Sequence, residues 1–257
     1  MTPRLHATVD GPPDAPALVL GSSLGTVGAM WAPQLPALTA HFRVIRYDHP
    51  GHGRSAVPPG PYTIELLGRE LLRLLDGLDA RRVHYAGLSL GGMVGMWLAA
   101  HAPERVGRLA LLCTSAALGP AQMWRDRAAA VRAGGMPAIA DAVVTRWFTP
   151  GFAAARPETV AACRAMLTST PVDGYAACCA VIATMDLRND LTGVRAPTLV
   201  VAGADDQATP VPHARLIAER IAGARLAIVE DAAHLANVQQ PERVSRLLLE
   251  HLAEETP

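Results

Sequence analysis

A serine flanked by glycines is the clearest candidate for chemistry in this sequence. Gly87, Ser89 and Gly91 form a Gly-x-Ser-x-Gly pentapeptide. The run before it, Val83–Ala86, is apolar, and the run after it, Met93–His101, is compatible with a helix. This context predicts a sharp strand-to-helix turn, where small neighbours permit a strained backbone and the hydroxyl points outward. A hydroxyl held in that way can attack a carbonyl carbon.

A serine hydroxyl is a weak nucleophile at neutral pH and needs a base within hydrogen-bond reach. Histidine suits this role, and an acidic residue bonded to the imidazole fixes its tautomer. Asp205 and Asp206 follow one expected strand, and His234 follows the next. The chain order Ser, Asp, His is typical of this kind of turn. We predict Ser89, Asp206 and His234 as catalytic residues; the spacing from Gly203 favours Asp206, and Asp205 is the alternative.

Attack by Ser89 would create a negatively charged oxygen, which needs backbone N–H donors beside it. The first residue of the helix after the turn, Leu90, should supply one of them. The second is expected from Gly21–Thr26, a loop of small residues that directly follows another strand. We predict the N–H of Ser23 as this second donor, with Leu24 as the alternative.

The elements that must position these residues alternate between strands and helices. Apolar runs predict strands at Arg4–Val9, Ala17–Leu20, Arg43–Tyr47, Val83–Ala86, Leu109–Cys113, Pro197–Gly203 and Arg225–Glu230. Helical patterns are found at Trp31–Ala40, Thr63–Asp76, Met93–His101, His213–Ile221 and Pro241–Ala253. This alternation predicts an α/β fold, a mostly parallel twisted sheet covered by helices on both faces. The loops after the strands would then meet at one edge of the sheet.

One stretch interrupts the alternation. Residues 118–190 are rich in alanine and helical in pattern, with no convincing strand. We interpret them as a helical cap inserted into a core made of residues 1–117 and 191–257. The loop Asp231–Asn237, which contains the candidate histidine, belongs to the second part of that core.

The composition excludes several classes of protein. Half of the 257 residues are hydrophobic and 18% are charged, so a large core is available. The formal net charge is zero, which gives no reason to expect a nucleic acid or an anionic membrane as partner. The first residues lack the apolar segment of a signal peptide, and no apolar run reaches the roughly 18 residues of a membrane span. We therefore expect a cytoplasmic protein with no membrane partner.

Cysteine and histidine spacing gives no support for a metal site. The four cysteines lack zinc-ligand spacing, and adjacent Cys178 and Cys179 would form a strained bridge, so we expect buried thiols. His49 and His52 lie close to Asp48, but no third ligand follows at a suitable spacing. We interpret the two histidines as parts of a structural turn.

Several motifs carry a resemblance to a known family. They are Ser23–Thr26 with Trp31, Tyr47–Ser55, Gly87–Met93, Val131–Met136, Arg146–Thr149, Asp186–Arg188, Ala202–Asp206 and Ala233–Val238. On these motifs the chain resembles the α/β-hydrolase superfamily over nearly its whole length. Within it, the chain is most similar to the 3-oxoadipate enol-lactonases of the β-ketoadipate pathway. Ser22 is a departure, because these lactonases often carry asparagine there.

The resemblance implies that the enzyme opens a small-molecule lactone to 3-oxoadipate through an acyl-enzyme at Ser89. It implies no metal or organic cofactor, and it is compatible with a homo-oligomer. The substrate of these lactonases also bears a free carboxylate, which costs free energy to bury without a partner. Cap arginines could bind it, and other side chains could wall the pocket. The carboxylate candidates are Arg125, Arg127, Arg132 and Arg146, and the wall candidates are Leu24, Trp124 and Trp147.

Other functions share the same three residues. A carboxylesterase or a hydrolase of carbon–carbon bonds would differ only in the cap. A dehalogenase or epoxide hydrolase is disfavoured, because those enzymes need an aspartate where Ser89 stands. A ligand-binding receptor on a hydrolase scaffold is a different class, which rapid multiple turnover would exclude.

Overall fold

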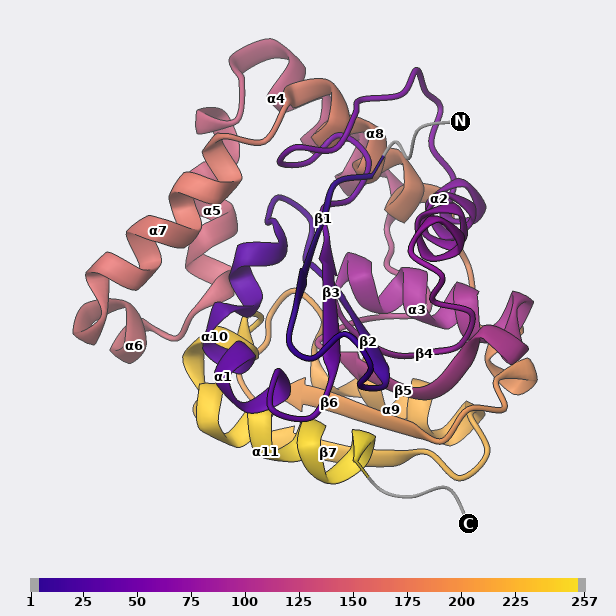
Figure 1. Ribbon diagram of the computed structural model, residues 1–257. Helices are drawn as coiled ribbons and strands as arrows, with labels where there is room; N and C mark the ends of the chain where they lie inside the picture. Colours follow the sequence, from indigo (N-terminus) through magenta and orange to yellow (C-terminus); the bar gives the residue numbers. More distant parts are fainter. Residues whose placement is uncertain (1–4, 254–257) are drawn as a thin grey trace.

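The fold is built around one twisted sheet, seen in a computed structural model that describes residues 5–253 (Figure 1). The sheet has seven strands in the order β1-β3-β2-β4-β5-β6-β7. They are β1 (Ala7–Asp10), β2 (Ala17–Gly21), β3 (Arg43–Tyr47), β4 (Val83–Leu88), β5 (Val106–Leu112), β6 (Thr198–Gly203) and β7 (Arg225–Val229). Only β1 is antiparallel to its neighbour. The predicted α/β fold with a mostly parallel sheet is confirmed.

The strand register brings the important loops to one edge. Gly21, the last residue of β2, lies opposite Gly87 of β4, and Leu88 lies opposite Leu112 of β5. The last residues of β6 and β7 are aligned in the same way. The loops that follow these strands therefore leave the sheet side by side, as the sequence pattern predicts. Arg4, the first residue of the expected edge strand, lies outside the described residues.

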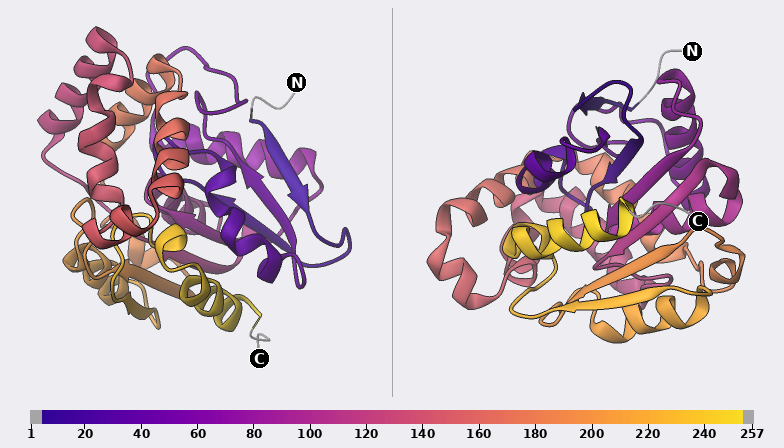
Figure 2. Two further views of the ribbon diagram at one scale, coloured as in Figure 1. Left: turned by 90° about the vertical axis from the view of Figure 1, so that its left-hand side faces the viewer. Right: turned by 60° about the horizontal axis from the view of Figure 1, so that its bottom comes forward.

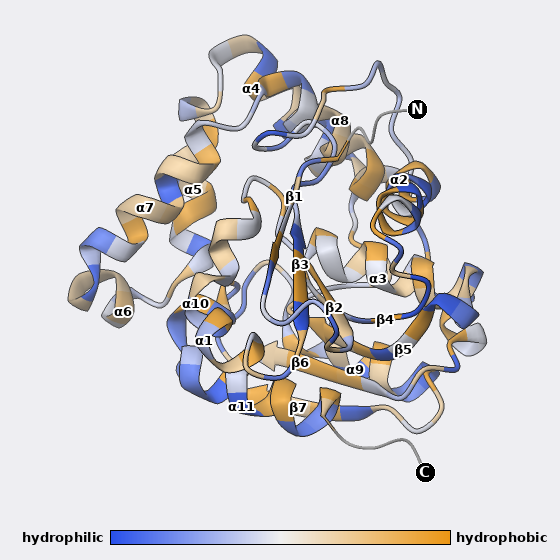
Figure 3. Cartoon of the chain, in the orientation of Figure 1, coloured by the Kyte–Doolittle hydropathy of each residue, from blue (hydrophilic) through white to orange (hydrophobic). Residues whose placement is uncertain are grey.

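Helices cover both faces of the sheet (Figures 1 and 2). One face packs against α2 (Ile64–Gly77), α3 (Leu90–His101), α9 (Val211–Arg220) and the short 3-10 helices η2 (Pro103–Arg105) and η3 (Asp190–Gly193). The other face packs against η1 (Gly28–Gln34), α1 (Leu35–Leu38) and α11 (Pro241–Leu252). In Figure 3, α2 and α11 each show hydrophobic and hydrophilic faces, as expected for helices that lie between core and solvent.

Two predicted helix boundaries are wrong. The expected helix Trp31–Ala40 is a 3-10 turn followed by a single α-helical turn. Pro33 lies inside the 3-10 turn and Pro36 inside the first turn of α1. Pro33 removes a backbone donor inside the 3-10 segment, whereas Pro36 stands in the first turn of α1, where a proline is tolerated. The loop after β7 also ends earlier than predicted, because Ala236 already begins the short helix α10 (Ala236–Gln239).

A helical cap lies between β5 and β6 in the chain (Figure 2). It consists of α4 (Ala121–Gly134), α5 (Pro137–Trp147), α6 (Pro150–Ala155), α7 (Pro157–Thr168) and α8 (Val172–Thr184). Helix α4 packs along α8, and α5 packs against both α4 and α7. The two ends of the cap segment meet where the Leu187 N–H donates to the Ala116 carbonyl at 2.8 Å. This pairing returns the chain to the sheet close to where it left.

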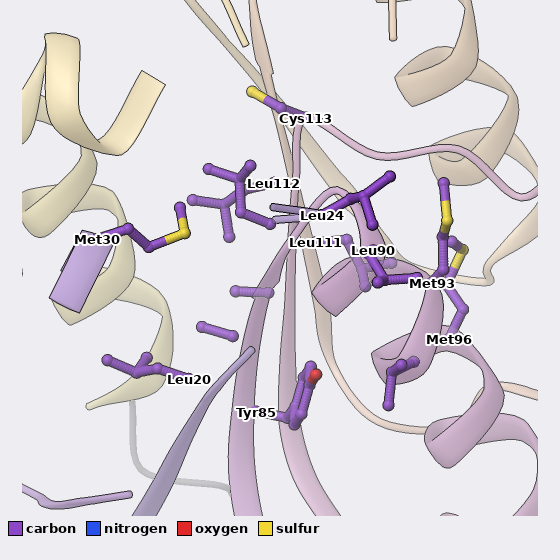
Figure 4. Close-up of a cluster of buried hydrophobic side chains, with 14 of the residues drawn as sticks. Leu20, Leu24, Met30, Tyr85, Leu90, Met93, Met96, Leu111, Leu112 and Cys113 are labelled. Carbon is purple, nitrogen blue, oxygen red and sulfur yellow. The ribbon is translucent and has the colours of Figure 1, made fainter. Parts of the chain in front are cut away.

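The core beneath the edge of the sheet where these loops meet is apolar and closely packed. Figure 4 shows side chains of β2, β4, β5 and α3 in contact. Met30 lies on the other side of the strands from α3. Tyr85 carries a polar group into this core, and its hydroxyl donates to the Gly91 carbonyl at 2.7 Å. The four cysteines are buried and free. In the described part of the chain no single helix is long and apolar enough to cross a membrane; α7 and α8 pass that test only as a pair bent by 92°.

Candidate active site

Ser89 occupies the turn between β4 and α3 in a strained conformation. Its φ is 56° and its ψ is −115°, a region that costs a non-glycine residue on the order of 1–3 kcal/mol. Its N–H donates to the Leu112 carbonyl at 2.9 Å, and the Thr114 hydroxyl donates to its carbonyl at 2.7 Å. These bonds to the strand and loop next to the turn hold the serine in place.

The glycines of the motif are required by close packing of backbone on backbone. A Cβ atom on Gly87 would lie 2.4 Å from the Gly91 carbonyl carbon, and one on Gly91 would lie 2.3 Å from that of Gly21. Neither backbone can move aside without displacing a central strand or α3. The glycines thus set the sharpness of the turn that presents Ser89.

Asp206 and His234 form a buried hydrogen-bonded pair. His234 Nδ1 lies 2.9 Å from Asp206 Oδ2. The same carboxylate accepts from the Thr209 hydroxyl at 2.7 Å and from the N–H groups of Ala208 and Thr209 at 2.8 and 3.0 Å. Burial raises the pKa of Asp206, but His234 and these donors outweigh burial and lower it to about 2. The acid therefore stays ionised and fixes the imidazole tautomer.

The structure distinguishes the two adjacent aspartates. Asp205 is exposed, whereas Asp206 is buried behind the imidazole. Ser89 and His234 both line one pocket, and Asp206 lies outside its lining. The candidate nucleophile and base therefore line the same cavity, and the candidate acid bonds the imidazole from outside its lining.

Two buried histidines hold the loop after β2. His49 Nε2–H donates to the Ser22 carbonyl at 2.8 Å, and His52 Nε2 accepts the Gly25 N–H at 3.0 Å. Burial lowers the pKa of His49 to about 3 and that of His52 to about 4. Both rings are therefore neutral near pH 7 and act as fixed hydrogen-bonding groups. Among the described residues, no group of three His, Cys, Asp or Glu side chains could hold a metal ion.

The backbone N–H groups that could stabilise an oxyanion differ in whether they already donate a hydrogen bond to another atom. The Ser23 N–H, the preferred choice from the sequence, donates to the Met30 thioether at 3.3 Å. Among the described residues, the N–H groups of Leu24 and Leu90 have no acceptor. Leu24 is thus the freer donor, and Ser23 could serve only by exchanging a weak sulfur acceptor for a charged oxygen.

The cap side of the pocket carries positive charge and aromatic rings. Trp124, Arg127, Arg146 and Trp147 line it together with Leu24, so five of the seven side chains that the sequence offers as substrate contacts line one cavity. The Arg127 guanidinium lies 4.5 Å from the centre of the Trp124 ring. Burial, and then the charge of Arg127, lowers the pKa of Arg146.

Neither pocket arginine has a carboxylate partner in residues 5–253. The Nε–H of Arg146 donates to the Ala142 carbonyl of its own helix at 3.3 Å. The other two candidates from the sequence, Arg125 and Arg132, are exposed and do not line the pocket. Two guanidinium groups that line one cavity have the chemistry to bind an anionic part of a ligand.

The pocket lining also contains residues that were not predicted from the sequence. Tyr175 of α8 is buried beside Arg127, and Thr209 both lines the pocket and bonds Asp206. Thr209 had a usable signal, because a hydroxyl three residues after an acid at a strand end often bonds the carboxylate. Tyr175 had none, since nothing in the spacing of α8 indicates which of its faces meets the cavity.

Comparison with known proteins agrees with this geometry. A family profile described as alpha/beta hydrolase fold matches residues 16–241. The curated 3-oxoadipate enol-lactonase 2 of Acinetobacter baylyi is 41% identical over 238 residues, covering 93% of this chain and 89% of the relative.

Two solved structures extend the comparison. The enol-lactonase from Burkholderia xenovorans LB400 superposes with a TM-score of 0.96 at 42% identity, covering 97% of this chain and 96% of the other. A thermophilic esterase from Thermogutta terrifontis with malate bound gives a TM-score of 0.92 at 30% identity, covering 97% and 93%. The similarity therefore extends through the cap as well as the core.

Proposed function

Because the chain belongs to the α/β-hydrolase fold family, we propose that it hydrolyses the ring ester of 3-oxoadipate enol-lactone to 3-oxoadipate. The observation that carries the proposal is a single pocket that combines Ser89 and His234 with the guanidinium groups of Arg127 and Arg146. An ester that bears a carboxylate needs a nucleophile and a base at its ester group and positive charge at its carboxylate, and this pocket combines the two. Similarity to enol-lactonases over more than nine-tenths of the chain supports this lactone among such esters.

In the first half of the reaction, Ser89 Oγ attacks the lactone carbonyl carbon. His234 Nε2 takes the hydroxyl proton, and Asp206, bonded to Nδ1, stabilises the imidazolium that forms. The Leu90 N–H and an N–H of the loop after β2, from Leu24 or Ser23, stabilise the oxyanion. The ring C–O bond then breaks, and the proton held by His234 passes to the leaving enol oxygen. The enol remains tethered to the acyl group and tautomerises to the ketone.

In the second half, a water molecule replaces the serine. His234 takes a proton from the water, whose oxygen attacks the acyl carbon. The bond to Ser89 Oγ breaks, and His234 returns the proton to that oxygen. The products are 3-oxoadipate and the enzyme in its starting state. This chain's residues supply every proton transfer, and no cofactor enters the proposed cycle.

The cap has a binding role in this proposal. We take residues 118–190 as the cap and residues 1–117 and 191–257 as the core, of which residues 5–253 are described. Arg127 and Arg146 would bind the free carboxylate of the substrate, while Trp124 and Trp147 would pack against its carbon chain. Charge-assisted bonds to a carboxylate would compensate for the burial of both groups.

The experiment is a spectrophotometric assay of the loss of the conjugated enol-lactone, with wild type and Ser89→Ala side by side. Wild type should turn over many times, and Ser89→Ala should lose roughly 10⁴- to 10⁶-fold in kcat. If the wild-type protein does not hydrolyse the lactone but does hydrolyse aryl acetates, its function would be that of a carboxylesterase and not of a lactonase. Full activity in Ser89→Ala would contradict both functions.

A further inference from the structure

The loop that carries His234 depends on one buried amide for its shape. Residues 231–235 form neither helix nor strand, yet His234 must stay at the pocket that Ser89 also lines if it is to act as the base. The side chain of Gln239, in α10, lies directly against this loop. Its Oε1 accepts the Ala233 N–H at 3.1 Å, and its Nε2 donates to the Asp231 carbonyl at 2.8 Å.

The same amide also reaches the cap. Gln239 Oε1 accepts the Thr149 N–H at 3.3 Å, and Nε2 donates to the Thr149 hydroxyl at 2.5 Å. Thr149 joins α5 to α6, and its hydroxyl also accepts the Phe152 N–H at the start of α6. All four hydrogen-bonding positions of the Gln239 amide are therefore used, two on the histidine loop and two on the cap.

A second bond links the two regions on the other side of His234. The Leu235 N–H donates to the Trp147 carbonyl at 3.0 Å. Trp147 lines the pocket, so it belongs to the wall that a substrate would contact. The residues before and after His234 are thus both tied to cap residues 147–149, one directly and one through Gln239.

We propose that Gln239 is a positioning residue that couples the docking of the cap to the orientation of the His234 imidazole. The inference rests on the proposed function, in which His234 is the base. A buried polar network with every bond satisfied is rigid and sensitive to the loss of one member. A substrate that packs against Trp147 would thereby stabilise the loop geometry needed for proton transfer.

The test compares Gln239→Leu with Gln240→Leu. Gln240 is the matched control, because its side chain donates to the same Asp231 carbonyl at 3.0 Å but makes no bond to the cap. Both variants are assayed on the enol-lactone and on an aryl acetate, with kcat and KM determined across the pH range. The low-field NMR signal of the proton between His234 and Asp206 is recorded for each.

Gln239→Leu should lower kcat by about 10- to 100-fold, with a much smaller change in KM, since a misplacement of about 1 Å can cost that much in rate. It should also shift the acid limb of the pH profile and broaden the His234 proton signal. Gln240→Leu should match wild type in both. If Gln239→Leu fails to fold, Thr149→Val, which removes the hydroxyl that bonds Gln239 and Phe152 but keeps the Thr149 N–H bond to Gln239, should give the same changes on a smaller scale.

An unchanged pH profile and NMR signal in Gln239→Leu, with kcat within twofold of Gln240→Leu, would overturn the coupling. For Thr149→Val, wild-type values would do the same. The proposed function fails separately, since it would be contradicted by an active Ser89→Ala. An inactive Ser89→Ala combined with a normal Gln239→Leu would leave catalysis intact and remove only the role of Gln239.

Discussion

The two sides of the active-site pocket are built in opposite ways. On the core side, the carboxylate of Asp206 accepts four hydrogen bonds from three residues. On the cap side, Arg127 and Arg146 face the cavity, and no carboxylate in residues 5–253 forms a salt bridge with either. The carboxylate on the core side is fully hydrogen-bonded without a ligand, whereas the cap side carries positive charge that a ligand can balance.

This difference corresponds to two separate tasks. Chemistry at a carbonyl group needs donors and bases that are already in place, because reorganisation during the reaction raises its barrier. Recognition of a charged substrate needs the reverse, an unbalanced charge that becomes balanced only when the correct ligand binds. The core should therefore control kcat and the cap should control KM, and the predictions that follow test this division.

The largest effect should come from the core-side acid. Asp206→Asn keeps the size of the side chain but removes the charge that stabilises the imidazolium. We expect kcat to fall by roughly 10³- to 10⁴-fold while KM stays within a few-fold, measured in the lactone assay. The matched control is Asp205→Asn at the exposed neighbour, which should behave as wild type. Equal losses in the two variants would show that the acid is not Asp206.

An intermediate effect should appear in the pH dependence of stability. Burial keeps His52 neutral in the folded protein, with a pKa of about 4, below the ordinary histidine value of 6.5. Between those two pH values the unfolded chain binds a proton at this position and the folded chain does not. The free energy of unfolding should therefore decrease as the pH falls from 6.5 toward 4, by on the order of 3 kcal/mol.

The variant that isolates this effect is His52→Gln. A glutamine Oε1 reaches about as far as the Nε2 that accepts the Gly25 N–H bond, but it does not titrate in this range. Urea unfolding at several pH values should show a shallower loss of stability for the variant than for wild type. The same slope in both proteins would mean that other groups cause the acid sensitivity.

The core side of this comparison could be predicted from sequence because local patterns determine it. The catalytic candidates each follow an apolar strand, and parallel strands bring the loops after them to one edge. The glycines around Ser89 indicate a tight turn because no larger residue fits there. The prediction for Trp31–Ala40 was wrong in helix type, because apolar periodicity was given more weight than Pro33, which removes a backbone donor inside the stretch.

The cap side was predictable only in part. Trp124, Ala128 and Val131 of α4 are buried and recur at helical spacing, which places Arg127 near the same face and Arg125 to one side of it. That spacing could have separated the two arginines from sequence. The role of Gln239 could not have been found in this way. It bonds Thr149, ninety positions earlier in the chain, and an amide has no spacing that indicates such a partner.

The smallest effect, and the sharpest test of the division, concerns the pocket arginines. Arg127→Met or Arg146→Met removes a charged donor to the substrate carboxylate, worth about 1.5–3 kcal/mol, so KM for the lactone should rise roughly 10- to 100-fold. The value of kcat should change little, and hydrolysis of an uncharged aryl acetate should be unaffected. Arg125→Met, at an exposed position on α4, is the matched control. A fall in kcat on both substrates would mean that the cap contributes to chemistry, and the division between core and cap would not hold.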